Sequence, residues 1–179
     1  MGTFLPEFHD IGIEESDGLL MTVLIQPSLR HRSIYFELHQ VRSSYKLYWC
    51  YETPYDEILA FCRENGYLDK LKDFDEFLNN EDILTAIKKQ TVRDSGYLEE
   101  PDEEFFMRFI HDGLPKLDRK PPWGLDGHSY YITIKGNPDR SYHAWCVIPK
   151  EWSRIQELIE RLGNYTDFSG YNYKVSGIK

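Results

Sequence analysis

The first third of the chain alternates apolar and polar residues with the period of a β-strand. Residues 33–41 place Ile34, Phe36 and Leu38 on one face, and residues 45–51 repeat the alternation after a short polar link. β-Branched and aromatic residues are also frequent over the whole segment from Leu19 to Tyr51, as is typical of half-buried strands. The pattern predicts an antiparallel meander.

A helical period replaces the alternation in the middle of the chain. Residues 53–66 predict a helix in which Pro54 occupies the first turn and Gly66 ends the helix in a left-handed conformation. We expect a second helix at residues 81–93 and a third at residues 101–113, where phenylalanines recur at helical spacing.

The clearest hairpin lies in the last third. The runs HSYYITI and SYHAWCVI flank a turn-forming segment, KGNPDR. A turn centred between residues 137 and 138 pairs Ile132 with His143. We therefore expect His128, Tyr130 and His143 to share one face of the sheet.

An amphipathic helix is predicted after the hairpin, from Pro149 to a C-cap at Gly163. Its apolar residues recur at the spacing of a helix with one buried face, and they are Trp152, Ile155, Leu158, Ile159 and Leu162.

Strands that come in neighbouring pairs favour an α+β fold with an antiparallel sheet built from two hairpins or meanders. A length of 179 residues with 41% hydrophobic residues suits one domain with its own core. We expect a single domain over residues 1–179. Residues 52–113 form its acidic helical insert, and residues 123–163 form the second hairpin with the long C-terminal helix.

Negative charge is concentrated in the middle of the chain. The formal net charge is −9, and residues 52–104 alone carry 16 acidic and 6 basic residues. This balance argues against a protein that coats nucleic acid or binds an anionic membrane. Two interpretations stay open: solvated helix faces that keep the protein soluble, or a surface that meets a basic protein partner. In the second case the expected partner-binding residues are Glu76, Glu81, Asp82, Glu100, Glu103 and Glu104.

No catalytic motif supports an enzyme. The sequence contains no GxSxG, P-loop, GxGxxG, HExxH or EF-hand pattern. Cys50, Cys62 and Cys146 lack zinc-ligand spacing, and each lies in an apolar stretch typical of a buried free thiol. We therefore expect neither a metal nor a cofactor. Free thiols, together with the lack of signal-peptide features and of a long apolar run, favour the cytoplasm.

A ligand site at the mouth of the second hairpin is the alternative hypothesis. It would use Asp126, His128, Tyr130 and His143, with Trp123 as a wall. A pocket formed by these groups would suit a small enzyme or a ligand-binding domain. The two histidines are separated by about 13 Å along the predicted ladder, at ~3.3 Å per residue, which is too far for them to share a metal ion.

Residues 123–163 resemble a recurring segment of small uncharacterised bacterial proteins. The shared features are a D-G-x-x-[WY] strand from Asp126 to Tyr130, a Y-H strand at Tyr142 and His143, and the amphipathic helix that follows. The chain is small, acidic and without a catalytic signature, and in this overall form it also resembles immunity proteins that neutralise secreted bacterial toxins. That resemblance implies a cytoplasmic, non-catalytic inhibitor of a basic, nuclease-like toxin. A phage-encoded inhibitor of a bacterial defence protein would share these features.

Overall fold

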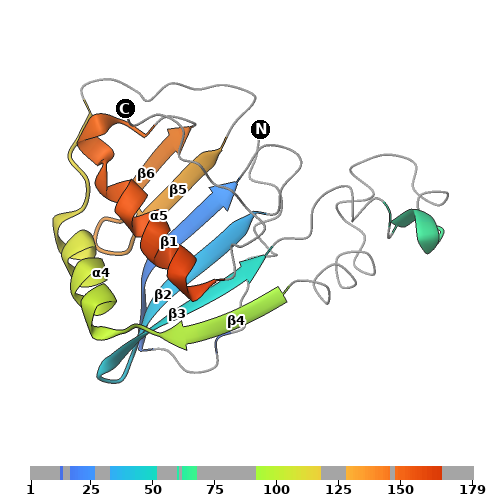
Figure 1. The fold of residues 1–179 in the computed structure, drawn as a ribbon, viewed down its shortest axis with the longest axis horizontal. Helices are drawn as coiled ribbons and strands as arrows, with labels where there is room; N and C mark the ends of the chain where they lie inside the picture. The colour runs from blue at the N-terminus through green and yellow to red at the C-terminus, as the bar shows by residue number, and fades with distance from the viewer. Residues whose placement is uncertain are drawn as a thin grey trace.

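The computed structural model describes residues 13, 17–26, 33–51, 60, 62–67, 92–117, 128–145 and 148–166. Figure 1 shows the arrangement of the helices and strands within them. The strands are β1 (Gly18–Gln26), β2 (Ile34–Val41), β3 (Ser44–Tyr51), β4 (Val92–Tyr97), β5 (Ser129–Ile134) and β6 (Arg140–Trp145). The helices are α4 (Glu100–Asp112), the short 3-10 helix η3 (Lys150–Trp152) and α5 (Arg154–Tyr165).

The strands form one 6-stranded sheet in the order β4-β3-β2-β1-β5-β6 (Figure 1), and every neighbouring pair is antiparallel. Strand β1 joins the first meander to the second hairpin because it pairs with β2 on one side and β5 on the other. Val23 of β1 lies opposite both Phe36 and Ile132. The predicted α+β fold with an antiparallel sheet is confirmed.

Helices α4 and α5 cover one face of this sheet (Figure 1). Phe106 and Phe109 of α4 and Leu158 and Leu162 of α5 are fully buried, in the same core cluster as Phe36 of β2. Burial of one such side chain contributes roughly 1.5–3 kcal/mol. The helices and the sheet therefore stabilise each other through a shared core.

The prediction of a helix over residues 81–93 is wrong at its end. Val92 instead begins β4, which pairs with β3. A Cβ atom on Gly96 would lie 3.6 Å from the Tyr165 ring and 3.7 Å from the Trp49 ring, so β4 runs close beneath both rings. Pairing with a distant strand decides the conformation here, and local periodicity does not reveal such pairing. The rest of that predicted helix lies outside the described residues.

The described end of the first predicted helix has the predicted conformation. Gly66 has a φ of 66°, and the N–H of Tyr67 donates to the carbonyl of Cys62 at 2.8 Å. A positive φ together with such a hydrogen bond back to the last turn is typical of an α-helix that ends with one residue in the left-handed conformation. The start of that helix lies outside the described residues.

The last helix ends later than predicted. Gly163 lies inside α5, and Thr166 is the C-cap residue. Tyr165 packs against the core, and its hydroxyl accepts the N–H of Glu99 at 3.1 Å. These tertiary contacts explain why the helix continues past a glycine that otherwise favours termination.

The second hairpin forms where it is predicted, but its register differs by one residue. The ladder pairs Tyr131 with His143, whereas the prediction paired Ile132 with it. The observed register places Tyr130, Ile132, Ile134 and Ala144 on the buried face of the sheet, and the burial of one face specifies the register of a strand. A shift of one residue moves side chains to the opposite face of the sheet.

Candidate functional site

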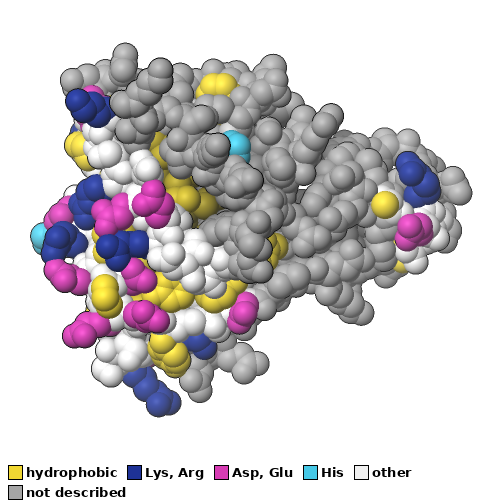
Figure 2. All heavy atoms as spheres, in the orientation of Figure 1, with side chains coloured by type: hydrophobic (Ala, Val, Ile, Leu, Met, Phe, Trp, Pro, Cys, Tyr) yellow, Lys and Arg dark blue, Asp and Glu magenta, His cyan; other side chains and the backbone are white. Residues whose placement is uncertain are grey.

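Helix α4 carries five acidic residues, one arginine and one histidine, and Glu100, Asp102 and Glu103 lie in its first turn. Pro101 suits this turn because no intrahelical N–H is needed there. The acids also favour the positive end of the helix dipole. Figure 2 shows acidic and basic side chains intermingled over the α4 and α5 side of the molecule.

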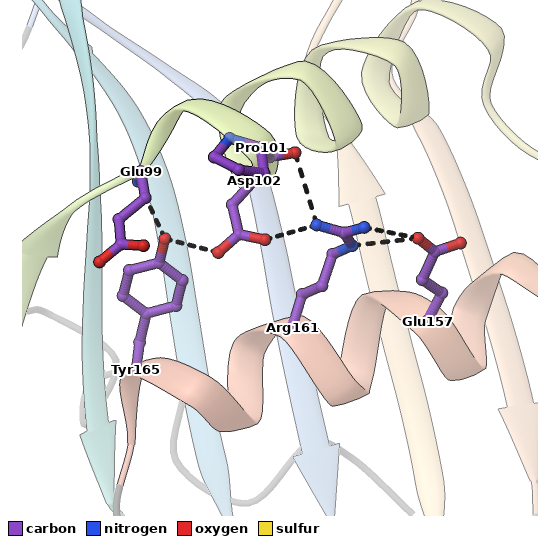
Figure 3. A network of polar contacts seen from close by, with 6 residues as sticks. All are labelled: Glu99, Pro101, Asp102, Glu157, Arg161 and Tyr165. Carbon is purple, nitrogen blue, oxygen red and sulfur yellow. Dashed lines mark hydrogen bonds and ion pairs between the residues drawn. The ribbon is translucent and has the colours of Figure 1, made fainter.

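Asp102 belongs to a polar network between α4 and α5 (Figure 3), and only 13% of its side chain is exposed. Its Oδ1 accepts a hydrogen bond from Arg161 at 2.6 Å, and its Oδ2 accepts one from the hydroxyl of Tyr165 at 2.7 Å. Burial raises the pKa of Tyr165 to about 12. A tyrosine phenol is protonated at neutral pH, and this shift keeps it protonated in moderately alkaline solution as well, so it continues to donate to Asp102.

Arg161 connects the two helices from the α5 side (Figure 3). Its Nη2 donates to Glu157 at 2.9 Å, and its Nη1 donates to the carbonyl of Pro101 at 3.4 Å as well as to Asp102. The guanidinium also lies 4.5 Å from the ring centroid of Phe105, a favourable cation–π distance. These contacts fix the first turn of α4 against α5.

A second set of contacts holds the C-terminal end of α4. Arg154 of α5 pairs with Asp112 at 3.2 Å and lies 5.3 Å from the ring centroid of Phe109. Arg140 of β6 donates to the last carbonyls of the helix, including that of His111 at 3.3 Å. The hydrogen bond from His111 and the charge of Arg154 lower the pKa of Asp112. Both ends of α4 are therefore held by arginines from other elements.

The other acids of α4 have different surroundings. Glu104 forms an exposed ion pair with Arg108 on the next turn, and such pairs contribute only about 0–1 kcal/mol. Glu100 is exposed and Glu103 is partly exposed. Within the described part of the chain, neither of them forms an ion pair. We call Glu100 and Glu103 the acidic pair.

The predicted partner-binding acids are thus only partly placed by the structure. Glu100, Glu103 and Glu104 lie together on the first two turns of α4. The other three predicted acids lie outside the described residues and are Glu76, Glu81 and Asp82.

Sequence reasoning did not single out Asp102, although a local signal for it exists. Asp102 precedes Phe105, Phe106 and Phe109 by three, four and seven residues. Residues at these spacings share one face of a helix, and Phe106 and Phe109 are fully buried. An acid that continues a buried stripe is expected to need a cationic partner.

The structure does not bring together the predicted ligand site at the second hairpin. Tyr130 is 4% exposed and belongs to the core, whereas His143 stacks on Tyr131 with ring centroids 4.3 Å apart on the other face of the sheet. The prediction that Tyr130 and His143 share a face is therefore wrong. His128 is partly buried and directly precedes β5. The remaining members lie outside the described residues and are Asp126 and Trp123.

Acidification is expected to destabilise the protein through His143. Burial lowers the pKa of this imidazole below its ordinary value of 6.5, and its Nε2 has no hydrogen-bond partner among the described residues. The unfolded chain then binds the proton more readily, so the free energy of unfolding falls as the pH drops below about 6.5. Urea unfolding at several pH values should give a smaller slope of stability against pH for His143→Gln. Equal slopes for the two proteins would contradict this assignment.

A second polar network lies on the sheet face opposite the helices. The hydroxyl of Tyr35 donates to Glu37 at 2.9 Å, and His39 Nε2 lies 2.8 Å from the other oxygen of Glu37. Burial raises the pKa of Tyr35. Both oxygens of the carboxylate are therefore engaged within the cluster.

An open hollow of about 720 Å³ follows the outer face of α5. Small-molecule sites are mostly lined by apolar and aromatic side chains, whereas every described residue that lines this hollow is polar or charged. These residues are Ser153, Gln156, Glu157, Glu160, Arg161 and Asn164.

Comparisons with protein-family models, curated proteins and solved structures find no match to the chain. Among the described residues, no three or more His, Cys, Asp and Glu side chains are grouped so that they could hold a metal ion. None of the described helices is long and apolar enough to cross a membrane.

Proposed function

We propose that the chain is a non-catalytic protein-binding protein that meets a basic partner with the first turns of α4. The proposal rests on one observation: some acids of this helix are paired with arginines of α5, and others are not. Asp102 and Asp112 are paired with arginines of α5. The acidic pair, Glu100 and Glu103, has no ion pair within the described residues.

Carboxylates on a rigid helix can accept hydrogen bonds from guanidinium or ammonium groups of a partner. Complementary charge also steers the encounter and selects among partners. The finer proposal is an immunity protein of the bacterial cytoplasm that covers a basic, nuclease-like toxin. It is supported by the acidic middle of the sequence and by the resemblance to immunity proteins in size, charge and lack of catalytic motifs.

A capture experiment with charge-reversed variants tests the proposal. Glu100→Lys with Glu103→Lys is compared with a control, Glu151→Lys with Glu160→Lys, which changes the net charge equally at exposed positions outside α4. Tagged proteins are incubated with extract of the source organism, and captured proteins are identified by mass spectrometry. We expect the unmodified chain and the control to retain the same basic protein, and the acidic-pair variant to lose it. Retention by all three, or a captured partner that is acidic, would refute the proposal.

A further inference from the structure

Two tyrosine hydroxyls accept the backbone N–H groups that flank α4. The hydroxyl of Tyr165 accepts the N–H of Glu99, and the hydroxyl of Tyr142 accepts the N–H of Leu114, both at 3.1 Å. The first pair lies at the N-terminal end of the helix and the second at its C-terminal end. Only the Tyr165 hydroxyl also donates to an acid of the helix, Asp102, at 2.7 Å. It therefore links the N-cap residue to the first turn (Figure 3).

The acidic pair lies in the turn that Tyr165 holds. Glu103 follows Asp102 directly, and Glu100 precedes it by two residues. Successive residues of an α-helix are rotated by about 100°, so fixing Asp102 toward α5 directs its neighbours to other sides of the helix. The exposure of Glu100 agrees with this geometry.

We propose that Tyr165 is a positioning residue for the acidic pair. Its hydroxyl holds the first turn of α4 in the orientation in which Glu100 and Glu103 meet the guanidinium groups of a basic partner. This inference rests on the proposed function. Association with a turn that is already ordered avoids the entropic cost of ordering it. Loss of the hydroxyl therefore weakens binding although no charge is removed.

The test compares Tyr165→Phe with the matched control Tyr142→Phe, because each substitution removes one hydroxyl and keeps the ring. Amide hydrogen exchange is measured along α4, and affinity is measured for a synthetic arginine-rich peptide. For Tyr165→Phe we expect exchange at Glu99, Glu100, Asp102 and Glu103 to rise about tenfold and affinity to fall about fivefold, because the two hydrogen bonds of the hydroxyl to the start of α4 are lost. For Tyr142→Phe we expect faster exchange only near Leu114 and an affinity close to that of the unmodified protein.

Two results would overturn the positioning role. One is faster exchange in Tyr165→Phe with unchanged affinity. The other is an equal loss of affinity in both variants, which would indicate only a general loss of stability. A separate variant tests whether the proposed function itself is wrong. If Glu100→Lys with Glu103→Lys leaves peptide affinity unchanged, the binding surface itself is wrong, whatever the tyrosine variants do.

Discussion

Replacement of Phe106 by alanine is expected to lower the free energy of unfolding by about 3–5 kcal/mol, the usual cost of removing a buried aromatic side chain. Phe106 is fully buried in the core cluster that α4 shares with the sheet. Its loss leaves a cavity beneath α4 that the surrounding strands cannot close without losing their own contacts. Urea unfolding followed by circular dichroism measures the effect.

Phe105→Ala is the matched control, because it removes the same atoms from the neighbouring position of α4. Phe105 is only partly buried and packs at the edge of the cluster beneath Arg161. We expect a clearly smaller loss of stability for this variant. Equal losses for the two variants would mean that α4 does not dock on the sheet through Phe106.

Replacement of Gly113 by alanine is expected to cost about 2–4 kcal/mol. Gly113 has a φ of 66° and a ψ of −157°, a backbone conformation essentially restricted to glycine that costs another residue roughly 1–3 kcal/mol. The new Cβ would also lie 2.6 Å from both the Arg140 guanidinium and the Tyr142 hydroxyl. Both groups must move away from the end of α4, and each lost hydrogen bond adds about 1 kcal/mol.

Gly66→Ala is the comparison at a glycine without crowding. Gly66 also has a φ of 66° but ends a helix in the left-handed conformation, and no atom of the described residues lies within 4 Å of the added Cβ. Its substitution should therefore cost only the backbone contribution of roughly 1–2 kcal/mol. If thermal or urea unfolding gives the same loss for both glycines, Arg140 and Tyr142 do not stabilise the end of α4.

The parts of the fold that depend on near neighbours in sequence are the parts that the sequence predicts. The phenylalanine stripe of α4 and the alternation in β2 are local patterns, and both elements form as expected. Strand β4 could not be predicted, because its edge position depends on pairing with β3 far earlier in the chain. The register of the second hairpin depends on which residues of β5 and β6 are buried in the core, and an error of one residue reversed the face assigned to His143.

In the candidate site, too, local features can be predicted from the sequence, whereas contacts between distant segments cannot. The concentration of acids at the start of α4 is visible in the sequence. Which acids face outward depends on Arg154 and Arg161, which lie on another helix and pair with Asp112 and Asp102. Composition alone cannot separate acids that hold the fold together from acids that remain available to a partner.

The salt dependence of binding to an arginine-rich peptide shows whether the first turns of α4 form the binding surface. Dissociation constants are measured at low and physiological ionic strength for three proteins: the unmodified chain, Glu100→Lys with Glu103→Lys, and the control Glu151→Lys with Glu160→Lys. We expect the acidic-pair variant to lose about tenfold or more in affinity at low salt, equivalent to ~1.4 kcal/mol, together with most of the salt dependence. The control should keep both. Equal losses in the two charge-reversed proteins would show that only net charge matters, and would contradict a binding surface on α4.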